Sequence, residues 1–233
     1  MTKSRRMLAA AALFFLAAAP GRAQVAIAGK AGSLGLGLEL TLGISPQLNA
    51  RLGANGFNYT DIHREVSGIE YDATAKLRTA TALLDWHPGG YGFRLTGGLV
   101  YNGTRIEGTS LPPASGFYDI GGVPVPVALV GTLNGKIDFN PTVPYLGLGW
   151  GNALLPGKTP GKKVGFYADA GVMFQGRGRA TLTPNIPAGS PLNNPTARAA
   201  LDILLRREES EIEDKVADYT VYPVVSLGLS YRF

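Results

Sequence analysis

The sequence predicts an all-β chain that folds as one antiparallel up-and-down barrel of eight strands, with a helix before the last strand. Apolar residues alternate with small or polar residues over several long segments, glycine is frequent with 32 of 233 residues, and cysteine is absent. Alternation with a period of two is typical of a strand with one apolar face. An apolar fraction of 45% argues against disorder.

The C-terminal segment shows the alternation most clearly. Its apolar face ends in two aromatic residues and comprises Val225, Leu227, Leu229, Tyr231 and Phe233. The opposite face is mostly small or polar. This pattern suits a transmembrane strand with lipid on one side and a membrane interface at its end. Taken alone, the segment also fits the last strand of a soluble sandwich.

Residues 1–23 predict a secretory signal, with a basic start, an apolar run over 7–19 and a small-x-small cleavage site at 21–23. We expect Gln24 to begin the mature domain at 24–233. An uncleaved anchor is the alternative, although the run is short for a transmembrane helix. Four of the 22 basic residues lie in this signal, which leaves 18 basic against 17 acidic residues. This balance does not favour a nucleic-acid partner.

A long alternating strand is predicted over 33–44. Leucine or isoleucine stands at every second position from Leu34 to Ile44, and the other face is rich in glycine. A barrel strand that spans a membrane needs roughly 9–11 residues, and small inward residues suit a narrow barrel. A tight turn at 45–47 leads into the next strand, at 48–59.

The segment 69–86 predicts a strand whose register stays open. Lys76 and Arg78 share one parity, whereas Asp85 has the other. A bulge, or an end that protrudes beyond the membrane, would reconcile them. Further strands are predicted at 93–102, 136–150, 164–175 and 221–233.

These segments make seven strands, whereas bacterial barrels of this kind have an even number. We therefore expect an eighth strand at 24–31. With eight strands, the short turns lie on the periplasmic side. Long loops are then expected on the extracellular side, at 60–68, 103–134 and 177–219.

A segment from about 195 to 217 breaks the alternation and predicts a helix. Asn194 can cap its N-terminus, and Pro195 suits the first helical position. We expect this helix on the extracellular side, packed over the rim or dipping into the lumen; a helix on the membrane surface is the alternative. Its many charges are most simply a solvated face.

The inward parity collects a predicted network of charges in the lumen. Its members are Glu39, Arg51, Lys76, Arg78, Arg94 and Asp169. Charges in a narrow interior must be paired. The network is either a salt-bridge plug or a polar path for small solutes, in which the arginine excess favours anions. Outside the lumen, Trp86, Tyr91 and Trp150 are predicted interfacial aromatics.

The chain resembles the small proteobacterial outer-membrane barrels of the OmpA/OmpW type. The resemblance is carried by residues 222–233, 83–88 and 144–151, and by a C-terminal Phe233 like that of the outer-membrane insertion signal. It implies a monomeric barrel in the outer membrane of a Gram-negative bacterium, inserted by the barrel-assembly machinery. It implies no activity, because such barrels serve many functions.

Two functions follow as expectations. The first is a narrow, porin-like channel for small solutes, whose selectivity the lumen charges set. The alternative is a closed barrel whose extracellular loops bind lipopolysaccharide or other partners. Replacing lumen arginines would separate the two, since only a channel has a conductance to change.

No constellation of residues predicts catalysis. His63 and His87 are followed by Arg-Glu and Pro-Gly, which departs from the His-x-Ser signature of the barrel deacylases. Two distant histidines and no cysteine argue against a zinc site. Four acids could contact a divalent cation loosely but suit a solvated loop better: Asp61, Glu65, Glu70 and Asp72. We expect no enzyme, no metal and no cofactor.

Overall fold

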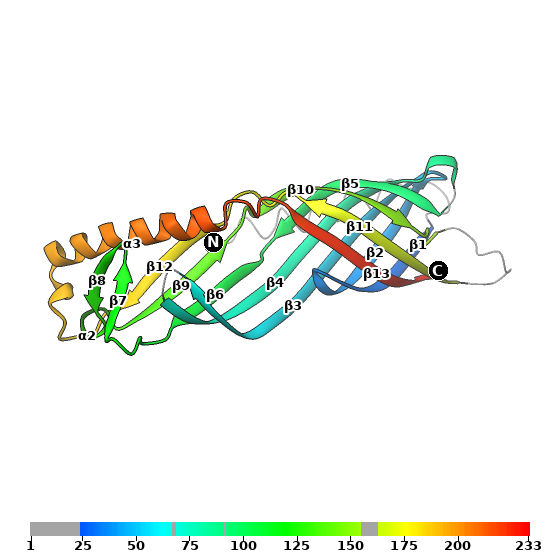
Figure 1. The fold of residues 1–233 in the computed structure, drawn as a ribbon. Helices are drawn as coiled ribbons and strands as arrows, with labels where there is room; N and C mark the ends of the chain where they lie inside the picture. Colours follow the sequence, from blue (N-terminus) through cyan, green and yellow to red (C-terminus); the bar gives the residue numbers. More distant parts are fainter. Residues whose placement is uncertain (1–23, 67–68, 91, 155–162) are drawn as a thin grey trace.

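The structure is a computed structural model that describes residues 24–66, 69–90, 92–154 and 163–233. The predicted signal at 1–23 and the predicted interfacial Tyr91 lie outside the described residues. Figure 1 shows an elongated molecule with a barrel at one end and a smaller sheet covered by a helix at the other. Across the described ranges, no helix is long and apolar enough to cross a membrane.

Eight strands close the barrel, and each pairs antiparallel with the next. In spatial order they are β1 (Val25–Gly32), β2 (Gly35–Ser45), β3 (Leu48–Val66), β4 (Ile69–Trp86), β5 (Phe93–Asn102), β10 (Thr142–Trp150), β11 (Val164–Met173) and β13 (Tyr222–Arg232). The ring closes where β13 pairs with β1, from Ala26↔Arg232 to Gly32↔Ser226. Closure pairs the edge backbone groups of β1 and β13, so the barrel has no free edge. The predicted eight-stranded antiparallel barrel is confirmed.

The strand β4 takes part in both the barrel and a second sheet. Its residues 79–86 pair with β5, whereas its residues 71–76 pair with β6. The second sheet extends beyond the barrel through β6 (Arg105–Ser110), β9 (Thr132–Asp138) and β12 (Arg179–Asn185). We call everything built on this extension the head. It also contains β7 (Phe117–Ile120), β8 (Val123–Pro126), α2 (Val127–Val130), η2 (Pro191–Asn193) and α3 (Pro195–Lys215).

The head has a hydrophobic core of its own. Helix α3 and the β7–β8 hairpin cover one face of the extended sheet (Figure 1). Buried side chains come from all of these elements and include Ile69, Tyr118, Ile120, Leu133, Leu182, Leu201, Leu205 and Ile212. Burial of apolar surface is the main stabilising contribution to such a unit. The head is therefore a folded unit and not a group of loose loops.

The predicted extracellular loops are wrong in large part. The segment 60–68 is strand up to Val66, and only 67–68 lie outside the described residues. The segment 103–134 contains β6, β7, β8, α2 and the start of β9, and the segment 177–219 contains β12 as well as the helix. These strands are short, so their own alternation is too brief to predict them. In addition, β6, β9 and β12 pair with strands far away in the sequence.

The predicted single strand at 136–150 is two strands, β9 and β10. Pro141 lies in the break between them. Proline lacks a backbone N–H and is disfavoured inside a sheet, which explains why the ladder is interrupted here. Because of the break, β9 belongs to the head and β10 to the barrel.

Leu34 is also placed differently from the prediction. It was expected on the outward face with Leu36, but it lies in the two-residue turn between β1 and β2 and is only 8% exposed. The strict alternation begins at Gly35, whose φ of 92° suits glycine. Residues in the turn do not follow the pleat, so Leu34 packs inside the barrel.

The predicted helix is present as α3, and its N-terminus is capped as expected. The Asn194 side chain accepts a hydrogen bond from the Thr196 N–H at 2.9 Å, and Pro195 occupies the first turn. The helix packs on the head, not in the lumen. It has a buried stripe of Leu201, Leu205, Glu208 and Ile212.

Two glutamates of α3 bind the edge of the sheet and are not a solvated face. Strand β12 is the last strand of the head sheet, so its outer N–H groups have no strand partner. Leu182 N–H donates to Glu209 Oε1 at 2.7 Å, and Ala180 N–H donates to Glu213 Oε1 at 3.0 Å. The helix therefore protects an edge that would otherwise be free to pair with another chain.

We predict that the Glu209→Ala and Glu213→Ala double variant destabilises the packing of α3 on β12. Each lost hydrogen bond to a carboxylate should remove about 1.5–3 kcal/mol. Hydrogen exchange of the Ala180 and Leu182 amides would then accelerate. The matched control is Glu211→Ala, because Glu211 is exposed on the same helix. Unchanged protection of both amides in the double variant would contradict this role.

Candidate functional site

The outer wall of the barrel is apolar and bounded by aromatic side chains. Exposed Leu, Ile and Val residues cover every barrel strand. Near the short turns lie Trp86, Phe93, Trp150, Tyr231 and Phe233, and near the head lie Phe57, Tyr59 and Tyr101. From Phe93 to Tyr101 the strand rises roughly 20 Å along the barrel axis at an ordinary rise and tilt. This is close to the height of an apolar membrane band.

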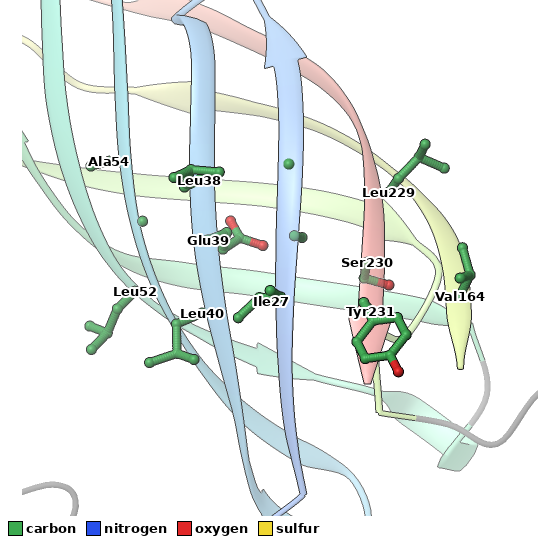
Figure 2. A pocket seen from close by; sticks show the side chains of 13 residues that line it. Ile27, Leu38, Glu39, Leu40, Leu52, Ala54, Val164, Leu229, Ser230 and Tyr231 are labelled. Carbon is green, nitrogen blue, oxygen red and sulfur yellow. The ribbon is translucent and has the colours of Figure 1, made fainter. Parts of the chain in front are cut away.

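A furrow of about 660 Å³ lies in this wall, over β1. Figure 2 shows Ile27, Leu38, Leu229 and Tyr231 around it. Gly29 is in register with Leu38 on one side and Leu229 on the other, and it carries no side chain to fill the space between them. The furrow is therefore a local thinning of the apolar wall.

The interior of the barrel holds an ionic layer in the half nearer the short turns. It consists of three cations and three anions: Lys30, Arg51, Arg94, Glu39, Asp85 and Asp169. They come from β1, β2, β3, β4, β5 and β11, so the layer crosses the whole lumen. Its formal charge is zero.

Arg51 lies at the centre of the ionic layer. Its Nη1 is 3.1 Å from Glu39 Oε1 and 3.0 Å from Asp169 Oδ2. Its Nε is 2.5 Å from Asp85 Oδ2, as an ion pair and not an aligned hydrogen bond. One guanidinium thus binds carboxylates from three different strands. Lys30 completes the layer, with its Nζ 2.9 Å from Glu39 Oε2.

Arg94 and Asp169 form the second strong pair of the layer. Arg94 Nη2 donates to Asp169 Oδ1 at 2.7 Å and Nε donates to the same oxygen at 3.2 Å. The guanidinium also donates to the Gly151 carbonyl and lies over the Tyr167 ring, 5.1 Å from its centre. Such a cation–π contact adds to the stability of a desolvated arginine.

Glycine makes room for this pair. Gly149 stands between Arg94 and Asp169 in the cross-strand register. A Cβ at Gly149 would lie 2.5 Å from Asp169 Oδ1 and 2.6 Å from Arg94 Nε. The two side chains can therefore meet only because the intervening strand has no side chain there.

Side chains fill the lumen at two levels. The cavity among Glu39, Arg51, Asp85 and Arg94 has a volume of only about 10 Å³, which is about the space of one water molecule. Nearer the head, an apolar layer follows, formed by Leu34, Leu83, Val100, Val143, Tyr145, Met173 and Val224. An ionic layer and an apolar layer thus close the barrel in series.

The structure brings together four of the six predicted lumen charges, namely Glu39, Arg51, Arg94 and Asp169. Lys76 and Arg78 do not join them. Arg78 is exposed and donates to backbone carbonyls, and Lys76 pairs with Glu107 at the start of the head sheet.

The parity of β4 explains this difference. In the register with β3, Leu77, Thr79, Thr81, Leu83 and Asp85 face inward. The prediction placed Lys76 and Arg78 on the inward face of β4. Asp85 has the opposite parity, so the prediction missed it. No bulge is needed between Ala75 and Trp86, because the register shift lies in β3, between Tyr59 and Ile62. The expected excess of arginine over acidic side chains is also wrong, since with Asp85 the ionic layer has as many anions as cations.

The two histidines lie at opposite ends of the β3–β4 hairpin. His63 is exposed and pairs with Asp72 on the β3–β4 hairpin. His87 is buried at the turn after β4, and neither ring nitrogen has a hydrogen-bond partner among the described residues. In the described part of the chain, no group of three or more His, Cys, Asp or Glu side chains could hold a metal ion.

No protein-family model and no curated protein matches this sequence. Solved structures do match. Acinetobacter baumannii CarO2 has a TM-score of 0.53 and 21% identity over 92% of this chain and 100% of that one. Acinetobacter baumannii CarO has a TM-score of 0.54 and 19% identity over 90% of this chain and 98% of that one. The fold of this chain is therefore similar to that of CarO over nearly the whole length of both.

We predict that Arg51→Met strongly destabilises the barrel, because three buried carboxylates lose their shared cation. Breaking a buried pair from one side typically costs about 3–5 kcal/mol. The measurement is the urea concentration at which the compact, unboiled gel band of the folded barrel is lost. Arg78→Met is the matched control and should change stability by less than about 0.5 kcal/mol. Equal midpoints for both variants would refute a central role of Arg51.

We also predict that Gly149→Ala destabilises the barrel by about 1–3 kcal/mol, since the new methyl group overlaps the Arg94–Asp169 pair. Gly97→Ala is the control, because a Cβ there faces outward and meets only Leu146 Cδ2 at 3.6 Å. The same gel assay in urea compares the two variants. A loss that is no larger for Gly149→Ala than for Gly97→Ala would show that the interior is not tightly packed here.

Proposed function

We propose that this protein is an integral bacterial outer-membrane barrel with a closed lumen, and that its head binds molecules on the extracellular side. The apolar wall and its two aromatic boundaries support the membrane location, because an exposed belt of this kind would be unfavourable in water. We extend the proposal to a monomer of the OmpA/OmpW type, surrounded by lipid and lipopolysaccharide, with lipid chains in the Gly29 furrow.

The orientation of the barrel in the membrane follows from the difference between its two ends. The turns at 46–47 and 87–90, the start of β1 and the end of β13 lie at one end of the barrel. The whole head lies at the other end, together with the two-residue turn at 33–34. In bacterial barrels the short turns are periplasmic and the long connections extracellular. The head is then extracellular, and Phe233 is at the periplasmic end, where the barrel-assembly machinery would read it.

The filled lumen is the observation that carries the proposal. All six charges of the ionic layer are paired across it, and the apolar layer follows in series. A path for solutes would require both layers to rearrange, with loss of buried ion pairs. The folded head, in contrast, is accessible without any change in the barrel.

A narrow channel is the second candidate, and the ionic layer itself favours it. A plug made only of apolar side chains would have no charges to guide an ion, whereas paired charges could exchange partners during a rare opening. The neutral balance of the layer removes the reason to expect anion selectivity.

Single-channel recording in a planar bilayer tests the proposal. We expect no discrete openings from folded protein, whose unboiled and boiled gel bands differ in mobility. Arg94→Ala should lower the stability of the barrel and leave the bilayer silent. Discrete openings of the unmodified protein, with a conductance that Arg94→Ala changes, would overturn the closed barrel in favour of the channel.

A further inference from the structure

The sheet of the head has a core face and an open face. Helix α3 and the β7–β8 hairpin pack on the core face, where Tyr71, Leu133 and Leu182 are buried (Figure 1). Successive side chains of a strand alternate between the two faces of a sheet. The side chains between these core residues therefore lie on the open face, where they are half-buried or exposed on β4, β6, β9 and β12.

Strand β4 joins the open face to the outer wall of the barrel. In the barrel its even-numbered residues face outward, and Leu84 is 51% exposed. The same parity continues into the head through Arg78 and Lys76, because β4 pairs with β6 in an unbroken register from Tyr71 to Lys76. The open face is thus a direct continuation of the apolar wall.

Tyr101 marks the boundary between the apolar wall and the open face. Its side chain is 60% exposed, and it pairs with Ala80 of β4. A Cβ at Gly103 would lie 3.5 Å from Arg78 Cβ and 3.6 Å from Tyr101 Cε1, so Arg78 and Tyr101 flank the same glycine. At an ordinary rise and tilt, Arg78 lies about 5 Å farther along the barrel axis than Ala80. An arginine therefore follows directly after the aromatic boundary.

The two cross-strand rows of the open face that are nearest to the barrel are rich in cations. The first row runs from Lys76 of β4 through Arg105 of β6 and Asp138 of β9 to Arg179 of β12. The second row contains Glu107 of β6, which pairs with Lys136 of β9. We call these two rows together with Arg78 the basic patch. It contains five cations and two anions.

The two lysines of the basic patch neutralise its two acids. Lys76 pairs with Glu107, and Lys136 Nζ lies 2.6 Å from Asp138 Oδ2. All four side chains are partly exposed. The net positive charge of the patch therefore comes from its arginines.

The three arginines of the patch have charge to spare. Arg105 Nη1 is 3.7 Å from Glu107 Oε1, a carboxylate that Lys76 already binds. Arg78 donates to backbone carbonyls, and Arg179 Nη2 donates to Asn140 Oδ1 at 3.1 Å. These acceptors are neutral, and all three arginines are exposed. A guanidinium in this state can bind a phosphate group with two parallel N–H donors.

The positive charge is confined to the part of the open face that adjoins the barrel. The next row away from the barrel consists of Asp72, Thr109, Asn134 and Thr183. It contains one acid and no cation. The basic patch is thus a band directly beyond the apolar wall and not a general property of the head.

We propose that the basic patch binds the phosphate groups of lipopolysaccharide in the outer leaflet, while the acyl chains of the same molecule lie on the apolar wall. Arg78, Arg105 and Arg179 donate to the phosphates. An amphiphile with phosphates beside its acyl chains matches a cationic band that adjoins an apolar wall, whereas a polyanion in solution would contact the band alone. This inference names a partner of the head and rests on the proposed membrane location and orientation.

The test uses the full chain, folded in maltoside micelles, and measures the binding of bisphosphorylated lipid A by native mass spectrometry. The double variant Arg105→Gln with Arg179→Gln should weaken binding roughly tenfold, as expected for loss of charged hydrogen bonds. The matched control is Arg206→Gln with Arg207→Gln, because both arginines are exposed on α3, on the other side of the head sheet. The control should retain the affinity of the unmodified chain.

Two further probes separate the phosphate groups from the rest of the lipid. Dephosphorylated lipid A should bind more weakly, and Arg105→Gln with Arg179→Gln should not weaken its binding further. Equal losses of bisphosphorylated lipid A in the two double variants would show attraction to net charge alone and would overturn the proposal. Displacement of lipid A by inorganic phosphate at an equal concentration of phosphate groups would also overturn it, in favour of a site for phosphate in solution.

The outcomes distinguish this inference from the proposed function. A silent bilayer, together with lipid A binding that both double variants weaken equally, retains the closed barrel and rejects the patch. Discrete channel openings, together with a loss confined to Arg105→Gln with Arg179→Gln, reject the closed barrel and retain the patch. A chain that stays in the aqueous phase when it is mixed with vesicles rejects the membrane location and the patch with it.

Discussion

The buried guanidinium of Arg51 is the interaction on which the barrel interior depends. It binds Glu39, Asp85 and Asp169, whose strands lie on different sides of the ring. A charge that is buried away from water is stable only when its ionic partners are held in place, and the closed sheet holds these three carboxylates in place. The same constraint explains the glycines of the interior. Large charged and aromatic side chains can cross a narrow lumen only where the neighbouring strands have no side chain.

The length of β4 separates the two parts of the molecule. A transmembrane strand needs roughly 9–11 residues, whereas β4 has 18. Its second half closes the barrel with β5, and its first half carries β6 and the rest of the head sheet. One continuous strand thus connects the barrel, whose outer wall is apolar, to a unit with its own core. This connection places the core of the head outside the lumen.

The helix α3 shows how tertiary contacts change the meaning of a charged sequence. Its acidic residues fit a solvated face when read as a helix alone. In the fold, Glu209 and Glu213 bind the free edge of β12, and Glu208 is buried and accepts a hydrogen bond from the Gly121 N–H. Carboxylates are strong acceptors for backbone N–H groups, so they can replace a missing strand. No sequence pattern distinguishes this arrangement from ordinary surface charge.

The sequence by itself determined the barrel strands, the helix and four members of the ionic layer. A period of two over ten residues leaves little choice of face, and alternation therefore identified Glu39, Arg51, Arg94 and Asp169 as inward. The tertiary structure alone decided the face of β4, the membership of Asp85, the exclusion of Lys76 and Arg78, and the head. Those features depend on register and on pairing between distant segments, which a local pattern does not contain.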